Sequence, residues 1–249
     1  MKVAVCLKRV PDTTTKIRIA DDGQSIDRAD VQYIISPYDE FAIEEGILRK
    51  EAAGEGSVTL ITVGDSTAVE SLRKGLGMGA DDAVHVTTES SLDPRETAEA
   101  LAAVLKDRGD DLVLFGRQSV DGQSSQVGAQ TAAILGIPYV GDVVGLEIDG
   151  KEAKITREVE GGHVVLRGTL PIALGTQKGL NEPRYASLKG IMMAKKKPVE
   201  TVEAQTGAKT LETVALSPPP ERPEGKIVGE GADAVPELVR LLREEAKVI

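Results

Sequence analysis

Residues 116–128 contain the side chains and glycines best suited to hold a ligand. The segment reads Gly-Arg-Gln-Ser-Val-Asp-Gly-Gln-Ser-Ser-Gln-Val-Gly and separates a short apolar run from a helical pattern. Backbone N–H groups at a helix start, together with the hydroxyls of Ser124 and Ser125, can bind a phosphate group. The segment is therefore a candidate phosphate-binding loop. An ordinary strand-to-helix connection is the alternative.

Three other segments are expected to reach the same edge of a parallel sheet. Residues 6–13 follow the first expected strand, residues 63–65 follow the second, and residues 36–39 precede a helix. In an open α/β sheet, ligands bind outside the carboxyl ends of the strands, where the strand order reverses. Together with 116–128, these segments predict a nucleotide site at one edge of the sheet.

Strand and helix patterns alternate over the first half of the chain. Apolar runs of strand length are followed by amphipathic patterns, which indicates parallel strands joined by right-handed helical crossovers. The predicted fold is therefore α/β, with a doubly wound, mostly parallel, Rossmann-like sheet that binds an adenine nucleotide. We expect strands at 3–7, 57–63, 83–86 and 111–115, and helices at 38–50, 66–76, 93–106 and 126–135.

The pattern changes after about residue 140. An antiparallel ribbon is expected there, because polar and apolar residues alternate and the runs are joined by glycine turns. A buried strand then returns at 171–175, and an earlier small hairpin is expected at 17–26. The ribbon strands are expected at 144–148, 151–159 and 163–170.

A C-terminal arm is expected to leave the domain. The prolines of 217–225 indicate an extended linker, and residues 236–247 form an amphipathic helix pattern. An isolated helix of this kind must bury its apolar face, either on this chain or on a partner. We therefore divide the chain into a nucleotide-binding domain, 1–195, and a C-terminal arm, 196–249.

The composition argues against nucleic-acid, metal and membrane binding. The net charge is -10, and the chain has one cysteine and two histidines. A nucleic-acid binder normally has a basic face, and a zinc site needs more His and Cys residues than these. No apolar run approaches the ~20 residues that span a bilayer, and no signal peptide is evident, so we expect a soluble, intracellular protein. The basic run 195–197 is interpreted as solvated and partner-facing.

The sequence contains no recognisable catalytic arrangement. Gly75, Gly77 and Ala80 have the spacing of a dinucleotide fingerprint, but they close a helix and precede a strand, the reverse of the required order. No nucleophile is paired with a base. Three residues that could do chemistry are each interpreted as structural: Cys6, His85 and His163. We therefore predict a nucleotide binder without catalytic residues.

One block of the sequence resembles a known signature. Residues 180–188 read Leu-Asn-Glu-Pro-Arg-Tyr-Ala-Ser-Leu, and residues 191–197 read Ile-Met-Met-Ala-Lys-Lys-Lys. This block is similar to the signature of electron-transferring flavoprotein beta subunits. Supporting stretches lie at 7–10, 36–45 and 78–81, so the resemblance covers essentially the whole chain.

The resemblance implies a heterodimer and two nucleotides. In the family, an alpha subunit holds most of the site for a redox-active FAD, and the beta subunit buries a structural AMP. The C-terminal arm wraps the alpha subunit. The AMP site carried over by position comprises Cys6, Ser36, Pro37, Tyr38, Asp39, Val63, Gly116, Arg117, Gln118, Ser119, Val120, Asp121, Gly122, Gln123, Ser124, Ser125, Gln126 and Val127.

The resemblance also implies docking partners. Electrons pass from acyl-CoA dehydrogenases and other flavin dehydrogenases to a membrane quinone reductase, so the chain is expected to be a carrier subunit rather than an enzyme. It is expected in the cytoplasm, or in the mitochondrial matrix of a eukaryote. The recognition loop, with Leu188 as its apolar anchor, comprises Arg184, Tyr185, Ala186, Ser187, Leu188, Lys189, Gly190, Ile191, Met192 and Met193.

Three departures from the family pattern keep alternatives open. Thr13 stands where many members have a tyrosine near the flavin, and Met193 stands where some carry a modifiable lysine, so no modification is expected there. Residues 121–128 resemble a pattern of electron-bifurcating relatives, which oxidise NADH and hold a second FAD in place of AMP. A stand-alone regulatory module that binds adenine nucleotides is the second alternative to the carrier subunit.

Overall fold

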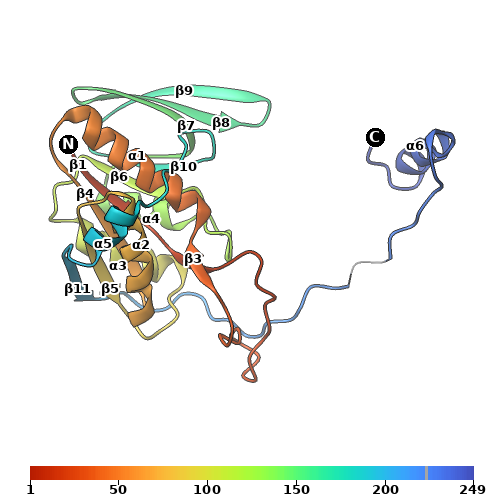
Figure 1. Cartoon of the computed structure of the whole chain (residues 1–249), viewed down its shortest axis with the longest axis horizontal. Coiled ribbons are helices and arrows are strands. Elements are labelled where there is room, and N and C mark those ends of the chain that lie inside the picture. Colours follow the sequence, from red (N-terminus) through yellow and green to blue (C-terminus); the bar gives the residue numbers. More distant parts are fainter. Residues whose placement is uncertain (222–223) are drawn as a thin grey trace.

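A large, mostly parallel sheet forms the centre of the molecule (Figure 1). The computed structural model describes residues 1–221 and 224–249, so Arg222 and Pro223 of the expected linker lie outside the described residues. The order of the strands in the sheet is β11-β5-β4-β1-β6-β10-β7-β8-β9. The strands are β1 (Lys2–Cys6), β2 (Arg9–Pro11), β3 (Tyr33–Ile35), β4 (Ser57–Gly64), β5 (Asp82–Thr87), β6 (Leu112–Gly116), β7 (Tyr139–Asp149), β8 (Glu152–Val159), β9 (Gly162–Thr169), β10 (Ile172–Thr176) and β11 (Val199–Glu203).

Helices cover both faces of this sheet, as the sequence predicts. Alternate residues of β1 enter different cores, because successive side chains of a strand point to opposite faces. Val3 and Val5 pack in the core beneath α1 and α2, whereas Ala4 and Cys6 pack beneath α3 and α4. The helices are α1 (Pro37–Ala53), α2 (Val69–Met78), α3 (Pro94–Leu105), α4 (Val127–Leu135), α5 (Leu188–Ala194) and α6 (Val235–Glu244), with short 3-10 turns at Ser66–Ala68 and Ala232–Ala234.

The strand order reverses between β1 and β6. From β1 the chain builds β4 and then β5 on one side, and α3 carries it back to β6 on the other side of β1. All these neighbours are parallel, so the carboxyl ends of β1 and β6 lie side by side. This is the place where a doubly wound sheet binds its ligand.

The antiparallel ribbon is confirmed. β7 runs parallel to β10 and then pairs antiparallel with β8, which pairs antiparallel with β9. The expected hairpin at 17–26 is reduced to a single antiparallel bridge between Ile19 and Ile26. No sequence pattern indicated β2 and β3, which form a separate two-stranded sheet.

The C-terminal segment starts as part of the sheet. β11 lies within residues 196–249 and pairs parallel with β5, so the expected boundary at 195 falls before the last strand of the sheet. The chain then runs over the start of α3. There Thr210 N and Leu211 N donate to Asp93 Oδ2 at 2.8 and 3.0 Å, and farther on Leu216 N donates to Gly23 O.

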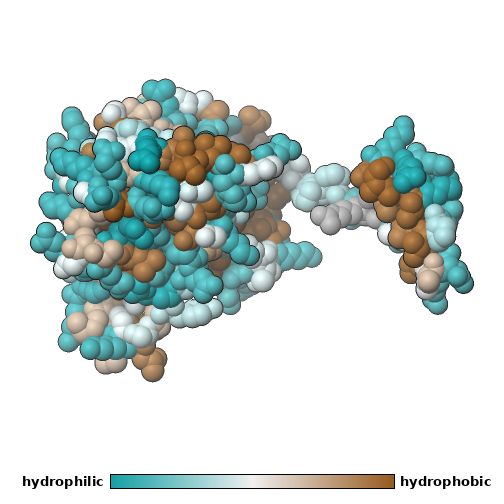
Figure 2. All heavy atoms as spheres, turned by 90° about the horizontal axis from the view of Figure 1, so that it is seen from above, coloured by the Kyte–Doolittle hydropathy of each residue, from teal (hydrophilic) through white to brown (hydrophobic). Residues whose placement is uncertain are grey.

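Helix α6 stands apart from the domain (Figure 1). Figure 2 shows an apolar face on it, and none of its residues is buried within the described part of the chain. The first of the two expected arrangements, packing on this chain's own domain, is therefore not the one observed. None of the described helices is long and apolar enough to cross a bilayer.

Asp93 provides a direct test of how the arm is attached. Its Oδ1 caps α3 through Glu96 N, and its Oδ2 holds residues 210–211. Asp93→Ala should therefore free the arm, and trypsin should cleave after Lys209 several-fold faster than in the parent protein. Asp107→Ala, at an exposed position two residues past the end of α3, is the matched control. Equal cleavage rates in all three proteins would show that Asp93 does not hold the arm.

Candidate functional site

The carboxylate of Asp39 lies at the switch point, where the strand order reverses, and the region beside the carboxyl ends of β1 and β6 is called the crevice below. Its Oδ2 accepts a hydrogen bond from Lys8 N at 2.7 Å, just beyond β1, and its Oδ1 accepts one from Gly116 N at 3.0 Å, at the end of β6. Asp39 belongs to the first turn of α1 and is only 6% exposed. One side chain thus joins two central strands and a helix start at the switch point.

Burial has the largest effect on the pKa of Asp39. Removal from water raises its pKa to about 7, although the two backbone N–H donors oppose that rise. A carboxylate is ordinarily ionised well below neutral pH. Near pH 7, the Asp39 carboxyl group is therefore partly protonated and partly ionised.

Close backbone packing surrounds this carboxylate. A Cβ atom on Gly116 would collide with the Asp39 side chain and lie 2.7 Å from the Tyr38 carbonyl carbon, so only glycine fits. Thr176, at the end of β10, places its Oγ1 3.0 Å from Tyr38 O and 3.1 Å from Phe115 O. The ends of three strands therefore meet the start of α1.

Ser36 brings an unpaired hydroxyl to the same place. The residue is fully buried, and its Oγ has no hydrogen-bond partner among the described residues. It occupies the N-cap position of α1, yet its side chain makes no capping bond, while its backbone N donates to Lys8 O at 2.9 Å. A buried hydroxyl without a partner costs stability unless a ligand or water satisfies it.

Loop 116–127 folds back on itself beside the crevice. Lys8 Nζ forms an ion pair with Asp121 at 2.7 Å, and Ser125 Oγ donates to Gln118 Oε1 at 3.1 Å. Gln123 and Ser125 adopt left-handed backbone angles, with φ of 48° and 54°. These turns bring the exposed segment 121–126 round to the start of α4.

Helix α4 begins without a side-chain cap. Gln126 occupies the N-cap position and makes no capping bond, whereas α3 and α5 are capped by Asp93 and Ser187. The first turn of a helix leaves backbone N–H groups without intrahelical acceptors. These donors, next to Ser124 and Ser125, are suited to an anionic group.

Arg117 connects the loop to the ribbon. Its Nε lies 3.2 Å from a carboxylate oxygen of Asp142, whose other oxygen lies 3.5 Å from Arg157. The Arg117 guanidinium also lies 5.8 Å from the centre of the Tyr38 ring. Asp142 has a left-handed φ of 55°, which no sequence pattern indicated.

The comparisons with known proteins agree on one family. The family model described as "Electron transfer flavoprotein domain" matches residues 24–206. Electron transfer flavoprotein subunit beta of Bacillus subtilis is 42% identical over the whole of both chains. The mitochondrial beta subunit of Arabidopsis thaliana is 36% identical over the whole of both chains, and the beta subunit of Sus scrofa is 33% identical over all of this chain and 99% of its own.

The chain belongs to the beta subunits of the electron transfer flavoprotein family. The resemblance carried by residues 180–197 is thereby confirmed, as is the α/β fold with its mostly parallel sheet.

The predicted residues of this beta subunit converge only in part. Residues 36–39 and Gly116 meet at the crevice, together with Lys8, which belongs to the predicted segment 6–13, and Thr176, which no predicted segment included. Cys6 lies just beneath them as a buried thiol, and burial raises its pKa. Lys8 followed the first strand directly in the sequence, and that position was a signal for its role.

Val63 and Thr13 belong to other elements than those that meet at Asp39. Val63 is half-buried near the end of β4, the strand next to β1. Thr13 is exposed in a turn where Asp12 Oδ1 accepts from Thr14 N at 2.8 Å. Within the described chain, no hydrogen bond or ion pair joins either side chain to the crevice.

The expected recognition loop, residues 184–193, is partly helical and is called the recognition segment below. Residues Leu188–Ala194 form α5, which Ser187 caps by accepting from Gly190 N at 3.0 Å, so the expectation of a loop is wrong for this part. The Ser-x-x-Gly spacing allows this cap but does not by itself reveal it. Leu188 is 84% exposed and Tyr185 is 98% exposed at its start.

Close packing explains the glycines that mimicked a dinucleotide fingerprint. A Cβ on Gly75 would lie 2.6 Å from Leu60, and one on Gly77 would lie 3.3 Å from Ala186. A Cβ on Gly190 would collide with Gly77 O. The glycines therefore let α2 approach the core on one side and α5 on the other.

The basic run 195–197 is not wholly solvated. Lys197 Nζ donates to Leu76 O at 3.1 Å and also contacts Ala80 O, and burial lowers its pKa. In return, Arg73 of α2 donates to Ala194 O at 2.6 Å. The solvated interpretation is wrong for Lys197, because it satisfies carbonyls at the end of α2; its two neighbours are exposed.

The histidines have no chemical role visible in the geometry. His85 is buried in β5, with Nε2 3.0 Å from Gly64 O, and His163 lies exposed at the start of β9. Within the described residues, no group of three or more His, Cys, Asp or Glu side chains could hold a metal.

A hollow of about 420 Å³ opens at the opposite edge of the sheet, near Lys2, Ser57 and Asp82, and contains no predicted site residue.

The raised pKa of Asp39 predicts a pH-dependent stability. Between its ordinary value of 3.8 and about 7, the folded protein keeps a proton that the unfolded chain has lost. The stabilisation from this group is therefore complete below 3.8 and is lost as the pH rises through about 7.

Asp39→Asn should remove this dependence. Urea unfolding across this range should show the stability of the parent, relative to the variant, falling with pH by at most about 1.4 kcal/mol per unit. Asp149→Asn, at an exposed ribbon turn, is the control. A difference in stability between the parent and Asp39→Asn that stays constant with pH would contradict the assignment.

Proposed function

We propose that this chain binds AMP in the crevice beside Asp39 and pairs with an alpha subunit to carry electrons. The heterodimer would take electrons from acyl-CoA and other flavin dehydrogenases and deliver them to a membrane quinone reductase, with FAD supplying the redox chemistry when bound. The observation that carries the AMP proposal is the fully buried, unpaired hydroxyl of Ser36 at the switch point, where Asp39 joins β1 and β6.

The residues present fit a mononucleotide. The uncapped start of α4, with Ser124 and Ser125, supplies donors for the phosphate. The buried Ser36 hydroxyl supplies a polar partner for the nucleoside. Asp39 is already bonded to two backbone N–H groups and therefore holds the protein frame rather than the phosphate.

None of the described residues forms a catalytic arrangement. FAD, held mostly by the alpha subunit and close to Thr13, would supply the redox chemistry when bound. The buried thiol and the buried histidine are structural. The chain is accordingly a carrier subunit rather than an enzyme, in a bacterial or archaeal cytoplasm or a mitochondrial matrix.

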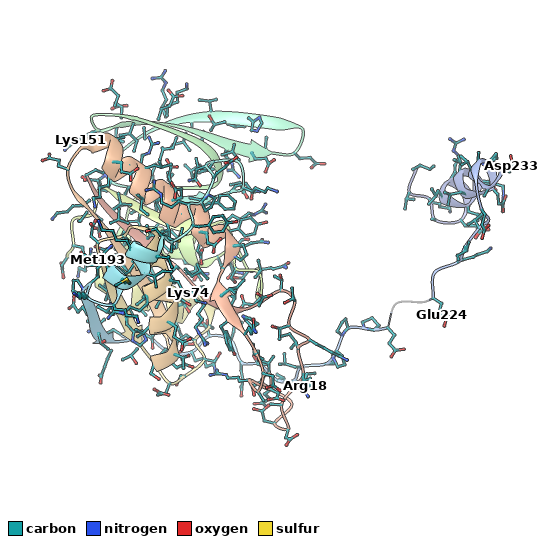
Figure 3. All side chains as sticks on the ribbon, in the orientation of Figure 1. Arg18, Lys74, Lys151, Met193, Glu224 and Asp233 are labelled. Carbon is teal, nitrogen blue, oxygen red and sulfur yellow. The ribbon has the colours of Figure 1, made fainter. Side chains whose placement is uncertain are left out.

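Two exposed apolar surfaces fit two protein partners. The recognition segment presents Tyr185, Leu188 and Met192 to solvent, and Figure 3 places Met193 on the same helix at the domain surface. These side chains suit a dehydrogenase. The apolar face of α6, at the end of the arm, suits the alpha subunit.

Nucleotide content tests the site. The heterodimer, purified and denatured, should release one FAD and one AMP. Ser36→Ala removes an unsatisfied hydroxyl, so the fold should keep its stability while AMP affinity falls about tenfold, the effect of losing one buried hydrogen bond. Ser217→Ala in the arm is the control. Two FAD and no AMP would favour the bifurcating alternative, and an unaltered AMP affinity in Ser36→Ala would remove Ser36 from the site.

Leu188 tests the docking surface. Leu188→Ala should lower kcat/KM for electron transfer from an acyl-CoA dehydrogenase by about tenfold, because an exposed anchor loses its contact with the partner. The unfolding curve should not change, since Leu188 packs little in the free chain. Leu211→Ala, an exposed leucine of the arm, is the control. Equal rates for Leu188→Ala and the parent would refute docking at this segment.

A further inference from the structure

Arg184 anchors the recognition segment to helix α1 through two carboxylates. Its backbone N donates to Glu44 Oε2 at 3.0 Å, and its Nε lies 2.9 Å from the same oxygen. Its two terminal nitrogens donate to Glu51 at 2.8 and 3.1 Å, and one of them also donates to Glu44 at 2.9 Å. The planar guanidinium is suited to such a forked arrangement, which lysine cannot reproduce.

The two glutamates differ in burial. The Glu44 side chain is 5% exposed, whereas the Glu51 side chain is 53% exposed. They are two helical turns apart and therefore lie on one face of α1. Arg184 thus spans this face from a buried contact to a solvent-exposed one.

A second side chain, Asn181, ties the chain to α1 just before Arg184. Asn181 Nδ2 donates to Phe41 O at 3.0 Å and to Glu45 Oε2 at 3.0 Å, so the chain is tied to α1 before it reaches Arg184. Glu45 is almost fully buried and also pairs with Arg49 at 2.9 Å. The Asn-x-x-Arg spacing therefore matches a row of acceptors along α1.

Arg184 and its contacts with α1 come directly before the exposed apolar side chains. Tyr185 follows Arg184, and α5 starts at Leu188, with its far end held by Arg73 on Ala194 O. The segment is thus fixed at both ends while its apolar side chains face solvent. Fixing a binding segment in advance lowers the entropy lost on association.

We propose that Glu44 and Glu51 are positioning residues for docking: they hold Arg184 so that residues 185–193 are ordered before a dehydrogenase arrives. Neither glutamate belongs to the recognition segment. The inference rests on the proposed docking role of that segment and adds that its order is set from α1.

The test uses the heterodimer with Glu51→Gln and, separately, Glu44→Gln. Glu51→Gln changes a half-exposed group and should fold normally, whereas Glu44→Gln alters a buried one. Glu55→Gln, just past the end of α1 and exposed, removes the same charge without touching Arg184 and is the control. Two readouts are needed: electron transfer from an acyl-CoA dehydrogenase, and amide hydrogen exchange of 185–194 in the free heterodimer.

The proposal expects both readouts to change together. The heterodimer concentration giving half-maximal rate should rise about fivefold in Glu51→Gln and more in Glu44→Gln, with kcat within about twofold of the parent. Exchange at 185–194 should be faster in both variants and unchanged in Glu55→Gln.

Other outcomes overturn the proposal in distinguishable ways. Weaker docking with unchanged hydrogen exchange would mean that the glutamates touch the partner directly and do not position the segment. Unchanged docking in both variants, while Leu188→Ala docks weakly, would refute the positioning role alone. If Leu188→Ala also docks normally, the docking function fails, and the positioning role fails with it.

Discussion

The hydrogen bonds of the Asp39 carboxylate to Lys8 N and Gly116 N are the constraint on which the arrangement of the site depends. They fix the start of α1 against the two strands between which the sheet order reverses. An ionisable group at 6% exposure is costly to desolvate, and its raised pKa reflects that cost. Both oxygens are used to join backbone groups, so Asp39 forms part of the frame around the place where we propose that the nucleotide binds.

Helix α1 contacts both the Asp39 region and the recognition segment. Its first turn lies in the crevice, and its acidic face receives Asn181 and Arg184. Thr176, at the end of β10, also contacts the start of α1. The chain that leads to the recognition segment therefore begins beside the crevice. The blocks 36–45 and 180–188, which carry the resemblance to the family, are therefore two sides of one contact.

The regular part of the fold could be predicted from the sequence, because buried parallel strands and amphipathic helices have strong periodic patterns. β1, β4 and β6 are continuous apolar runs, and the glycine-bounded ribbon was equally clear. β11 was missed because it is a half-exposed edge strand, Val-Glu-Thr-Val-Glu, with no apolar run. α5 was missed because it is short and depends on packing against Gly77 and on the bond from Arg73, which are distant in the sequence, and because the local cap by Ser187 has a spacing that does not by itself reveal a helix.

The crevice itself was predictable to the level of segments but not of side chains. Topology placed 36–39 and 116–127 together, whereas the two bonds of Asp39, the contact of Thr176 and the left-handed Asp142 depend on tertiary geometry. Lys197 shows the same limit: a lysine run is usually solvated, and only the folded chain shows the carbonyls of α2 that it satisfies.

Photolabelling of the heterodimer with 8-azido-AMP, followed by peptide mapping, would show where the nucleotide binds. We expect label on peptides containing 36–39 and 116–128, and excess AMP should suppress it. Label at the hollow near Lys2, Ser57 and Asp82, or only on the alpha subunit, would contradict the assignment of the nucleotide to the crevice beside Asp39.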